Sequence, residues 1–203
     1  MIRKIALALL AAVSFSVFAQ EAPDALVHRV TEEVLEIVRK DKDIQNGNTQ
    51  KVIDLVETRV LPHFNFTRMT SLAVGKEWRK ASPSQQQQLT QEFRTLLVRT
   101  YSNALTGYRN QKMVYKPFRM NAGDTDVLVR TEVVQPGAKA VQIDYSLEKQ
   151  DAGWKVYDVV VAGISLVTNY REQFGQEVRN GGIEGLIAAI AGKNRSLVAP
   201  QGK

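Results

Sequence analysis

Residues 126–161 read DVLVRTEVVQPGAKAVQIDYSLEKQDAGWKVYDVVV, and this stretch decides the fold class. Apolar or β-branched side chains occupy every second position in residues 127–133, and apolar ones do so again in residues 141–147. Residues 154–161 are nearly all β-branched or aromatic. A period of two is typical of β-strands that turn one face towards a core, so the stretch predicts three consecutive strands.

Short turn sequences separate these strands. Gln135-Pro136-Gly137 and Asp151-Ala152-Gly153 contain the residue types that tight turns require, and their positions predict two hairpins. Residues 113–120 are predicted to add a fourth strand on the N-terminal side. The expected sheet is therefore a four-stranded antiparallel meander with one face available to a core.

Before the sheet, the apolar residues follow the period of an α-helix. Asp24 is expected to cap a first helix, and a second helix should stop before Pro62, because the residue that precedes a proline disfavours the helical conformation. A third segment, residues 66–74, is closed by Gly75. The apolar positions of the first two helices are Leu26, Val30, Val34, Ile37 and Val38, then Val52, Ile53, Val56 and Val60.

The strongest local signal is Ser82-Pro83-Ser84-Gln85, a capping box with proline at the first helical position. It predicts a long helix whose apolar stripe consists of Leu89, Phe93, Leu96, Leu97, Tyr101, Ala104, Leu105 and Tyr108. After the sheet, residues 164–174 and 183–190 are predicted to form two more helices before a polar tail. Helices before and after one antiparallel sheet predict an α+β domain with helices packed on one sheet face.

Residues 1–19 have the three parts of a secretory signal peptide. Arg3 and Lys4 supply positive charge, residues 5–17 form an apolar run, and Val17-Phe18-Ala19 offers small residues for cleavage. The apolar run is shorter than the roughly 20 residues that span a bilayer. The sequence thus predicts export to the periplasm, with residues 20–203 forming a single domain that has a short polar C-terminal tail.

Charge and composition exclude several protein classes. Without Arg3 and Lys4, 25 basic and 21 acidic side chains leave a net charge of +4. This charge is too small and dispersed for a nucleic-acid-binding surface, but it is compatible with transient contact with an anionic membrane. The chain has no Cys, which excludes disulfides and thiolate chemistry.

The candidate catalytic groups are isolated in the sequence. His28 and His63 have no metal-ligating neighbours at suitable spacing, and Gly163-Ile164-Ser165 lacks the second glycine of a hydrolase nucleophile elbow. Strand carboxylates such as Asp144 and Asp158 could act as general bases in an isomerase, but Asp144 alternates away from the core face. We therefore predict no enzyme activity, no catalytic residues, no metal site and no cofactor.

A series of motifs in a fixed order resembles the MlaC family of periplasmic phospholipid-binding proteins, also called toluene-tolerance auxiliary components. The resemblance covers residues 25–193, with the motifs VLPHFNF (60–66), LAVGKEW (72–78), ASPSQQ (81–86), FRTLL (93–97), GWKVYDV (153–159), GISL (163–166), NYR (169–171) and GIEGLI (182–187). Asn65 replaces an aspartate that is typical of many members.

The resemblance implies a nuclear-transport-factor-like fold, with helices packed on a curved four-stranded sheet around an apolar cavity for phospholipid tails. It also implies a carrier that exchanges phospholipid between an outer-membrane lipoprotein–porin complex and an inner-membrane transporter with a lipid-binding ring protein. Such exchange would maintain outer-membrane lipid asymmetry. A periplasmic chaperone for apolar peptide segments is the alternative, although four Met residues are few for so adaptable a surface.

Candidate lipid-binding residues follow from the predicted faces and from the resemblance. They are Phe66, Met69, Leu72, Leu97, Tyr101 and Leu105 on helices, with Val129, Val133, Val141, Ile143, Tyr145, Val161 and Ile164 from the sheet and its exit. Each buried methylene contributes roughly 0.8 kcal/mol, so aliphatic walls would hold acyl chains tightly.

Overall fold

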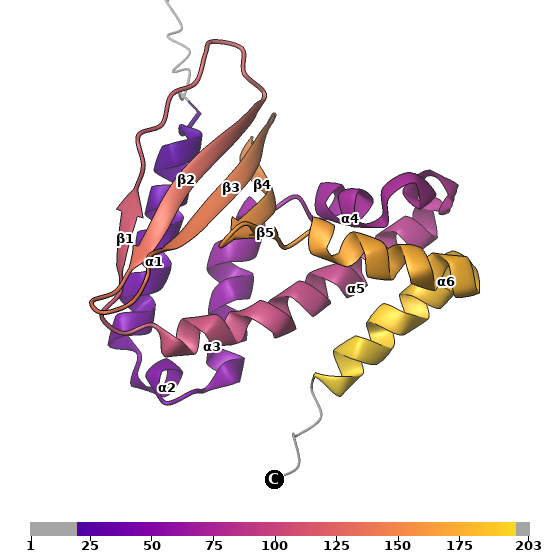
Figure 1. Cartoon of the computed structure of the whole chain (residues 1–203), viewed down its shortest axis with the longest axis horizontal. Coiled ribbons are helices and arrows are strands. Elements are labelled where there is room, and N and C mark those ends of the chain that lie inside the picture. Colours follow the sequence, from indigo (N-terminus) through magenta and orange to yellow (C-terminus); the bar gives the residue numbers. More distant parts are fainter. Residues whose placement is uncertain (1–19, 198–203) are drawn as a thin grey trace, which may run out of the picture.

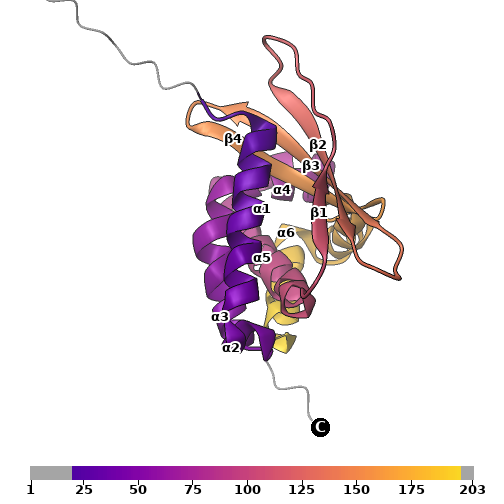
Figure 2. The same ribbon diagram turned by 90° about the vertical axis from the view of Figure 1, so that its left-hand side faces the viewer.

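A computed structural model describes residues 20–197, which form one antiparallel sheet flanked by helices (Figure 1). The signal peptide predicted for residues 1–19 lies outside the described residues, as do residues 198–203. Figure 2 shows α1, α3 and α5 on the same side of the sheet. The α+β class predicted from the sequence is confirmed.

The elements follow the order helices, sheet, helix. The helices are α1 (Pro23–Lys40), α2 (Lys42–Gln45), α3 (Thr49–Leu55), α4 (Phe66–Val74), α5 (Pro83–Tyr101) and α6 (Arg171–Ser196). The strands are β1 (Lys112–Tyr115), β2 (Asp126–Val134), β3 (Val141–Gln150), β4 (Gly153–Val161) and β5 (Ile164–Ser165). A π-helical turn (Val56–Val60) and 3-10 turns at Leu61–His63, Gly75–Lys80, Ser102–Gly107 and Thr168–Tyr170 join the helical segments.

The sheet is a meander in the order β1-β2-β3-β4-β5, so the antiparallel prediction is right, although the sheet has five strands instead of four. The fifth strand replaces the start of the helix predicted from residue 164. Ala162 and Gly163 both have positive φ, +50° and +84°, and turn the chain back so that Ile164 pairs with Val161. The first strand is shorter than predicted because Pro117 has no N–H with which to continue the ladder.

The alternation predicted for the strands correctly separates the two sheet faces. Val129, Thr131 and Leu147 are buried on the helix-covered face, under α1, whose Leu26 and Val27 complete this core. Asp144 belongs to the opposite face, since it alternates with Ile143 and Tyr145. A bulge at Ser146/Leu147 shifts the register against β4.

Three helix boundaries differ from the predictions. Ala22 is the N-cap of α1, with Pro23 at the first helical position, so Asp24 lies in the first turn and does not cap the helix. The second helix leaves the α conformation after Leu55 and continues as a π turn and a 3-10 turn that includes Pro62. The helix predicted to extend to Tyr108 ends at Tyr101, where Ser102 and Asn103, both weak helix formers, begin a 3-10 turn.

Two helix signals hold at the predicted positions. The capping box of α5 is confirmed, because Ser82 Oγ accepts from Gln85 N at 3.2 Å and Gln85 Oε1 accepts from Ser82 N at 2.9 Å. α4 spans the predicted Phe66–Val74, with Asn65 as its cap and Gly75 at φ +68° after its end. These signals are local in sequence, which is why they could be read directly.

A second core lies away from the sheet, where α4, α5 and α6 meet (Figure 1). Phe93 of α5 packs edge-on against Phe174 of α6, with 5.3 Å between ring centroids. α6 is kinked at Gly182, which has φ +66°, and its second half returns along α5 and continues to Ser196. The residues just after Ile190, predicted as the start of a polar tail, are therefore helical.

Candidate functional site

An apolar cavity of about 520 Å³ lies between the helices and the inner face of the sheet. α1, the π turn after α3, the C-terminal half of α5 and the 3-10 turn Ser102–Gly107 form one wall, and β2 to β4 form the other. Its volume falls within the roughly 300–1,000 Å³ of small-molecule sites.

The wall carries almost no charge. Among the residues that line it, none is Asp, Glu, Lys or Arg. Burial lowers the pKa of His63, and the positive charges of Arg29 and Lys155 lower it further, which favours a neutral imidazole. Burial also raises the pKa of Tyr145, which keeps that hydroxyl neutral. Such a wall suits a long apolar ligand and offers no acid–base pair.

Many of the predicted lipid-binding residues lie together on this wall. They are Phe66, Met69, Leu97, Tyr101, Leu105, Val133, Ile143 and Tyr145. They come from α4, α5, the following 3-10 turn and two strands, so the fold brings together segments that are far apart in the sequence.

The remaining candidates do not line the cavity. Val129 is buried in the core beneath α1, and Val161 packs partly buried against the same core. Leu72 belongs to the second core. Val141 and Ile164 face the inner side but lie at the sheet's margin, where they are 38% and 60% exposed.

Sequence reasoning missed the contribution of α1. Val30, Val34 and Leu35 line the cavity, as do Val56 and Val60 of the π turn. The apolar stripe of α1 was visible in the sequence, but a stripe that packs against a core and one that lines a cavity have the same spacing. Phe64, Tyr108, Met113, Val156 and Val159 were also missed.

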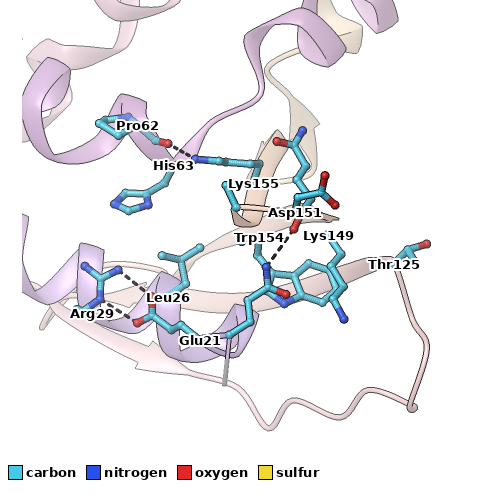
Figure 3. A pocket seen from close by; sticks show the side chains of 14 residues that line it. Glu21, Leu26, Arg29, Pro62, His63, Thr125, Lys149, Asp151, Trp154 and Lys155 are labelled. Atoms are coloured by element: carbon cyan, nitrogen blue, oxygen red, sulfur yellow. Dashed lines mark hydrogen bonds and ion pairs between the residues drawn. The ribbon is translucent and has the colours of Figure 1, made fainter. Parts of the chain in front are cut away.

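A polar pocket opens at the end of the cavity where α1 begins (Figure 3). Leu26 and His63 line both spaces. Arg29 donates from Nε and Nη2 to the two carboxylate oxygens of Glu21, each at 2.8 Å, and Lys155 Nζ donates to the Pro62 carbonyl at 2.6 Å. The charged groups of Glu21, Arg29 and Lys155 at this end are therefore occupied by neighbours within the chain.

The two strand carboxylates considered for catalysis lie outside the cavity wall. Asp158 accepts from Ser165 Oγ at 2.6 Å and from Val167 N at 3.3 Å, so it fixes the turn around β5. Asp144 accepts from Gln142 Nε2 at 2.8 and 3.0 Å. In residues 20–197, no group of three or more His, Asp or Glu side chains is placed to hold a metal ion, and no helix is long and apolar enough for a bilayer crossing.

The sequences of known proteins match nearly the whole of this chain. The sequence profile of the MlaC protein family matches residues 28–192. A toluene tolerance protein from Pseudomonas putida is 28% identical over 182 residues, which cover 89% of this chain and 84% of that protein. The intermembrane phospholipid transport system binding protein MlaC of Haemophilus influenzae is 22% identical over 181 residues, covering 88% and 85% of the two chains.

A solved structure matches the fold closely. It is a phospholipid-binding protein from Ralstonia solanacearum in complex with a phospholipid, with 41% sequence identity and a TM-score of 0.81. The match covers 87% of this chain and 99% of that one.

Proposed function

This chain belongs to the MlaC family, and from that premise we propose that it is a periplasmic carrier of phospholipids. The observation that supports the proposal most directly is the uncharged apolar cavity, in a chain 41% identical to a protein whose structure contains a phospholipid. The lining residues named above would contact the acyl chains. Phospholipid is the cargo, and the proposal includes neither a cofactor nor a catalysed reaction.

The physical basis of carriage is the cost of exposing acyl chains to water. Each methylene moved from water to the cavity contributes roughly 0.8 kcal/mol. Tails therefore remain bound during transit, whereas a hydrated headgroup stays near the surface. A wall with few polar groups recognises tails in general, so the proposed carrier accepts phospholipids with different chains.

Release requires the cavity to open, and α1 is the element that we expect to move. α1 contributes much of one wall, and one of its polar links to the sheet is a hydrogen bond from Tyr115 Oη to Glu32 at 2.9 Å, next to the contact between the Tyr115 and His28 rings. In the proposed cycle, docking at either membrane shifts α1 against β1. The docking partners would be an outer-membrane lipoprotein–porin complex and an inner-membrane transporter with a lipid-binding ring protein, and the outcome would be maintenance of outer-membrane lipid asymmetry.

The experiment is lipid extraction combined with native mass spectrometry of protein purified without harsh detergent. A carrier should arrive with bound phospholipid at a fixed stoichiometry and should take up phospholipid from vesicles after delipidation. Protein that arrives empty and takes up none would contradict the proposal. If the same protein instead suppressed aggregation of an unfolded client, the result would favour the chaperone alternative.

A further inference from the structure

A second polar pocket, of about 680 Å³, lies at the opposite end of the cavity from the one in Figure 3. It is formed where α1 ends and where the chain passes from the 3-10 turn Ser102–Gly107 into β1. Tyr108 and Gln111 line both this pocket and the apolar cavity. The polar pocket and the apolar cavity therefore adjoin at these two residues, which is the arrangement that a ligand with an apolar tail and a polar head requires.

This pocket has an uncompensated positive charge. Arg39, Arg109 and Lys112 line it, and no Asp or Glu does. Within residues 20–197, none of the three forms an ion pair with a carboxylate. At the other end, by contrast, Arg29 is paired with Glu21, and Asp151 also lines the pocket. An anion is thus favoured at the end where α1 terminates.

The arginines of this pocket are held in place by the surrounding chain. Arg109 donates to the carbonyls of Thr106, Tyr108 and Gln45 at 2.6, 2.8 and 2.8 Å. These bonds use three of the five guanidinium N–H groups, which leaves two for a ligand. Arg39 Nη2 donates to Tyr108 Oη at 3.1 Å, and its guanidinium lies 5.4 Å from the centre of the same ring. Both cations are pre-organised by contacts other than ion pairs.

Ser102 gives an independent indication of a polar ligand at this end. It lines the apolar cavity, is 5% exposed, and its Oγ has no hydrogen-bond partner among the described residues. A buried hydroxyl without a partner in the chain is unfavourable unless a ligand or a buried water supplies an acceptor. The ester carbonyl of a glycerolipid, located between the tails and the phosphate, is such an acceptor.

We propose that this pocket binds the phosphate group of the carried lipid, with Arg39, Arg109 and Lys112 around the anion and Ser102 donating to an ester oxygen. The inference rests on the proposed lipid-carrying function and adds the orientation of the cargo, with the headgroup at the C-terminal end of α1. The ligand chemistry is a phosphate ester anion, and free phosphate is the other source of the same chemistry.

The test compares two double variants that remove equal charge from the two ends. Arg39→Gln with Lys112→Gln alters the proposed site, and Lys149→Gln with Lys155→Gln alters the pocket of Figure 3. Binding of phosphatidylglycerol and of diacylglycerol with the same chains is measured for each variant, and thermal melts check that each is folded. We expect the first variant to bind phosphatidylglycerol about tenfold more weakly, the effect of losing roughly one charge-assisted contact, with diacylglycerol binding unchanged.

The outcomes distinguish a wrong headgroup site from a wrong carrier function. Loss of phosphatidylglycerol binding in the Lys149/Lys155 variant, or in neither variant, would overturn the proposed site while leaving the carrier function intact. Wild-type protein that binds neither lipid would overturn the function itself. Inorganic phosphate, followed by ³¹P NMR, should bind the lipid-free protein and not the lipid-loaded protein. Equal binding to both would assign the pocket to free phosphate and overturn the headgroup assignment.

Discussion

Asn65 donates a hydrogen bond from Nδ2 to the carboxylate of Glu148, which joins the start of α4 to β3. Its Oδ1 accepts from Arg68 N at 3.0 Å and caps the same helix. Arg68 in turn pairs with Glu148 and Asp126 and lies over the Tyr157 ring, 3.6 Å from its centre. The asparagine thus places an amide, not a second acid, against Glu148.

Replacing Asn65 by the aspartate that the family resemblance led us to expect should destabilise this chain at neutral pH. Aspartate caps a helix as well as asparagine does, but it cannot donate to Glu148 and adds a like charge beside it. We expect the free energy of unfolding to fall by about 1 kcal/mol at pH 7, measured by urea denaturation. In a Glu148→Gln background the same substitution should cost less. An equal cost in both backgrounds would show that the two residues are not coupled.

Glu148 should also contribute to acid sensitivity. Burial alone raises its pKa, but hydrogen bonds from Arg68, Asn65 and Gln150 outweigh burial and hold the pKa below its usual value. A lowered pKa means that the folded state favours the ionised form, so its stabilisation is complete above the unfolded value, near 4.5, and is lost as pH falls through the folded value. Unfolding free energy measured from about pH 5 to pH 3 should therefore fall less steeply in Glu148→Gln than in the wild type. Parallel curves would contradict this prediction.

The proposal that the apolar cavity holds the lipid can be tested by filling the cavity. Leu105 lines the cavity, and a Leu105→Trp side chain would occupy space that acyl chains need. Overpacking costs roughly 1–3 kcal/mol, so lipid affinity should drop about tenfold while the melting temperature of the lipid-free protein changes little. Ile164→Trp is the matched control, because Ile164 is 60% exposed and does not line the cavity. Equal lipid loading of the two variants would place the lipid elsewhere.

The sequence could predict what local patterns determine. The capping box at Ser82 and the alternation of β2 and β3 specify hydrogen bonds and faces within a few residues, and both are present in the structure. The cavity is not local, because its wall combines α1, α4, α5 and several strands that are far apart in the sequence. Val141 illustrates the limit: it pairs with the cavity residue Val133 and shares its face, yet no helix covers it at the sheet margin.

The buried hydroxyl of Ser102 predicts an unusual stabilising substitution. A buried polar group without a partner costs about 1–3 kcal/mol, so Ser102→Ala should stabilise the lipid-free protein by about 1 kcal/mol. Thr131→Val is the contrasting variant, because Thr131 is also buried but its Oγ1 donates to the Ile143 carbonyl at 3.0 Å. Thr131→Val should destabilise the protein by a similar amount. Chemical denaturation of both variants measures the difference, and destabilisation by Ser102→Ala would mean that its hydroxyl has a partner in solution.

The kink in α6 gives a prediction in which neighbouring residues have opposite effects. Gly182 has φ +66° and ψ −165°, a conformation that is essentially restricted to glycine, so Gly182→Ala should lower the free energy of unfolding by about 1–3 kcal/mol. Gly181 precedes it in helical conformation, and a methyl group added there would extend into open space, with no atom beyond its own helical turn within 4 Å. Gly181→Ala should therefore raise stability by about 0.5–1 kcal/mol.

The kink matters because it returns the second half of α6 to α5. Leu186 is fully buried there, and Asn194 Nδ2 donates to the Glu92 carbonyl at 2.9 Å. Straightening α6 at Gly182 would remove both contacts, whereas an alanine at 181 leaves them in place. Thermal denaturation of the two variants side by side provides the test, and equal shifts in the same direction would mean that the chain does not bend at Gly182. Because no residue of α6 lines the apolar cavity, neither variant should change lipid affinity under conditions where it remains folded.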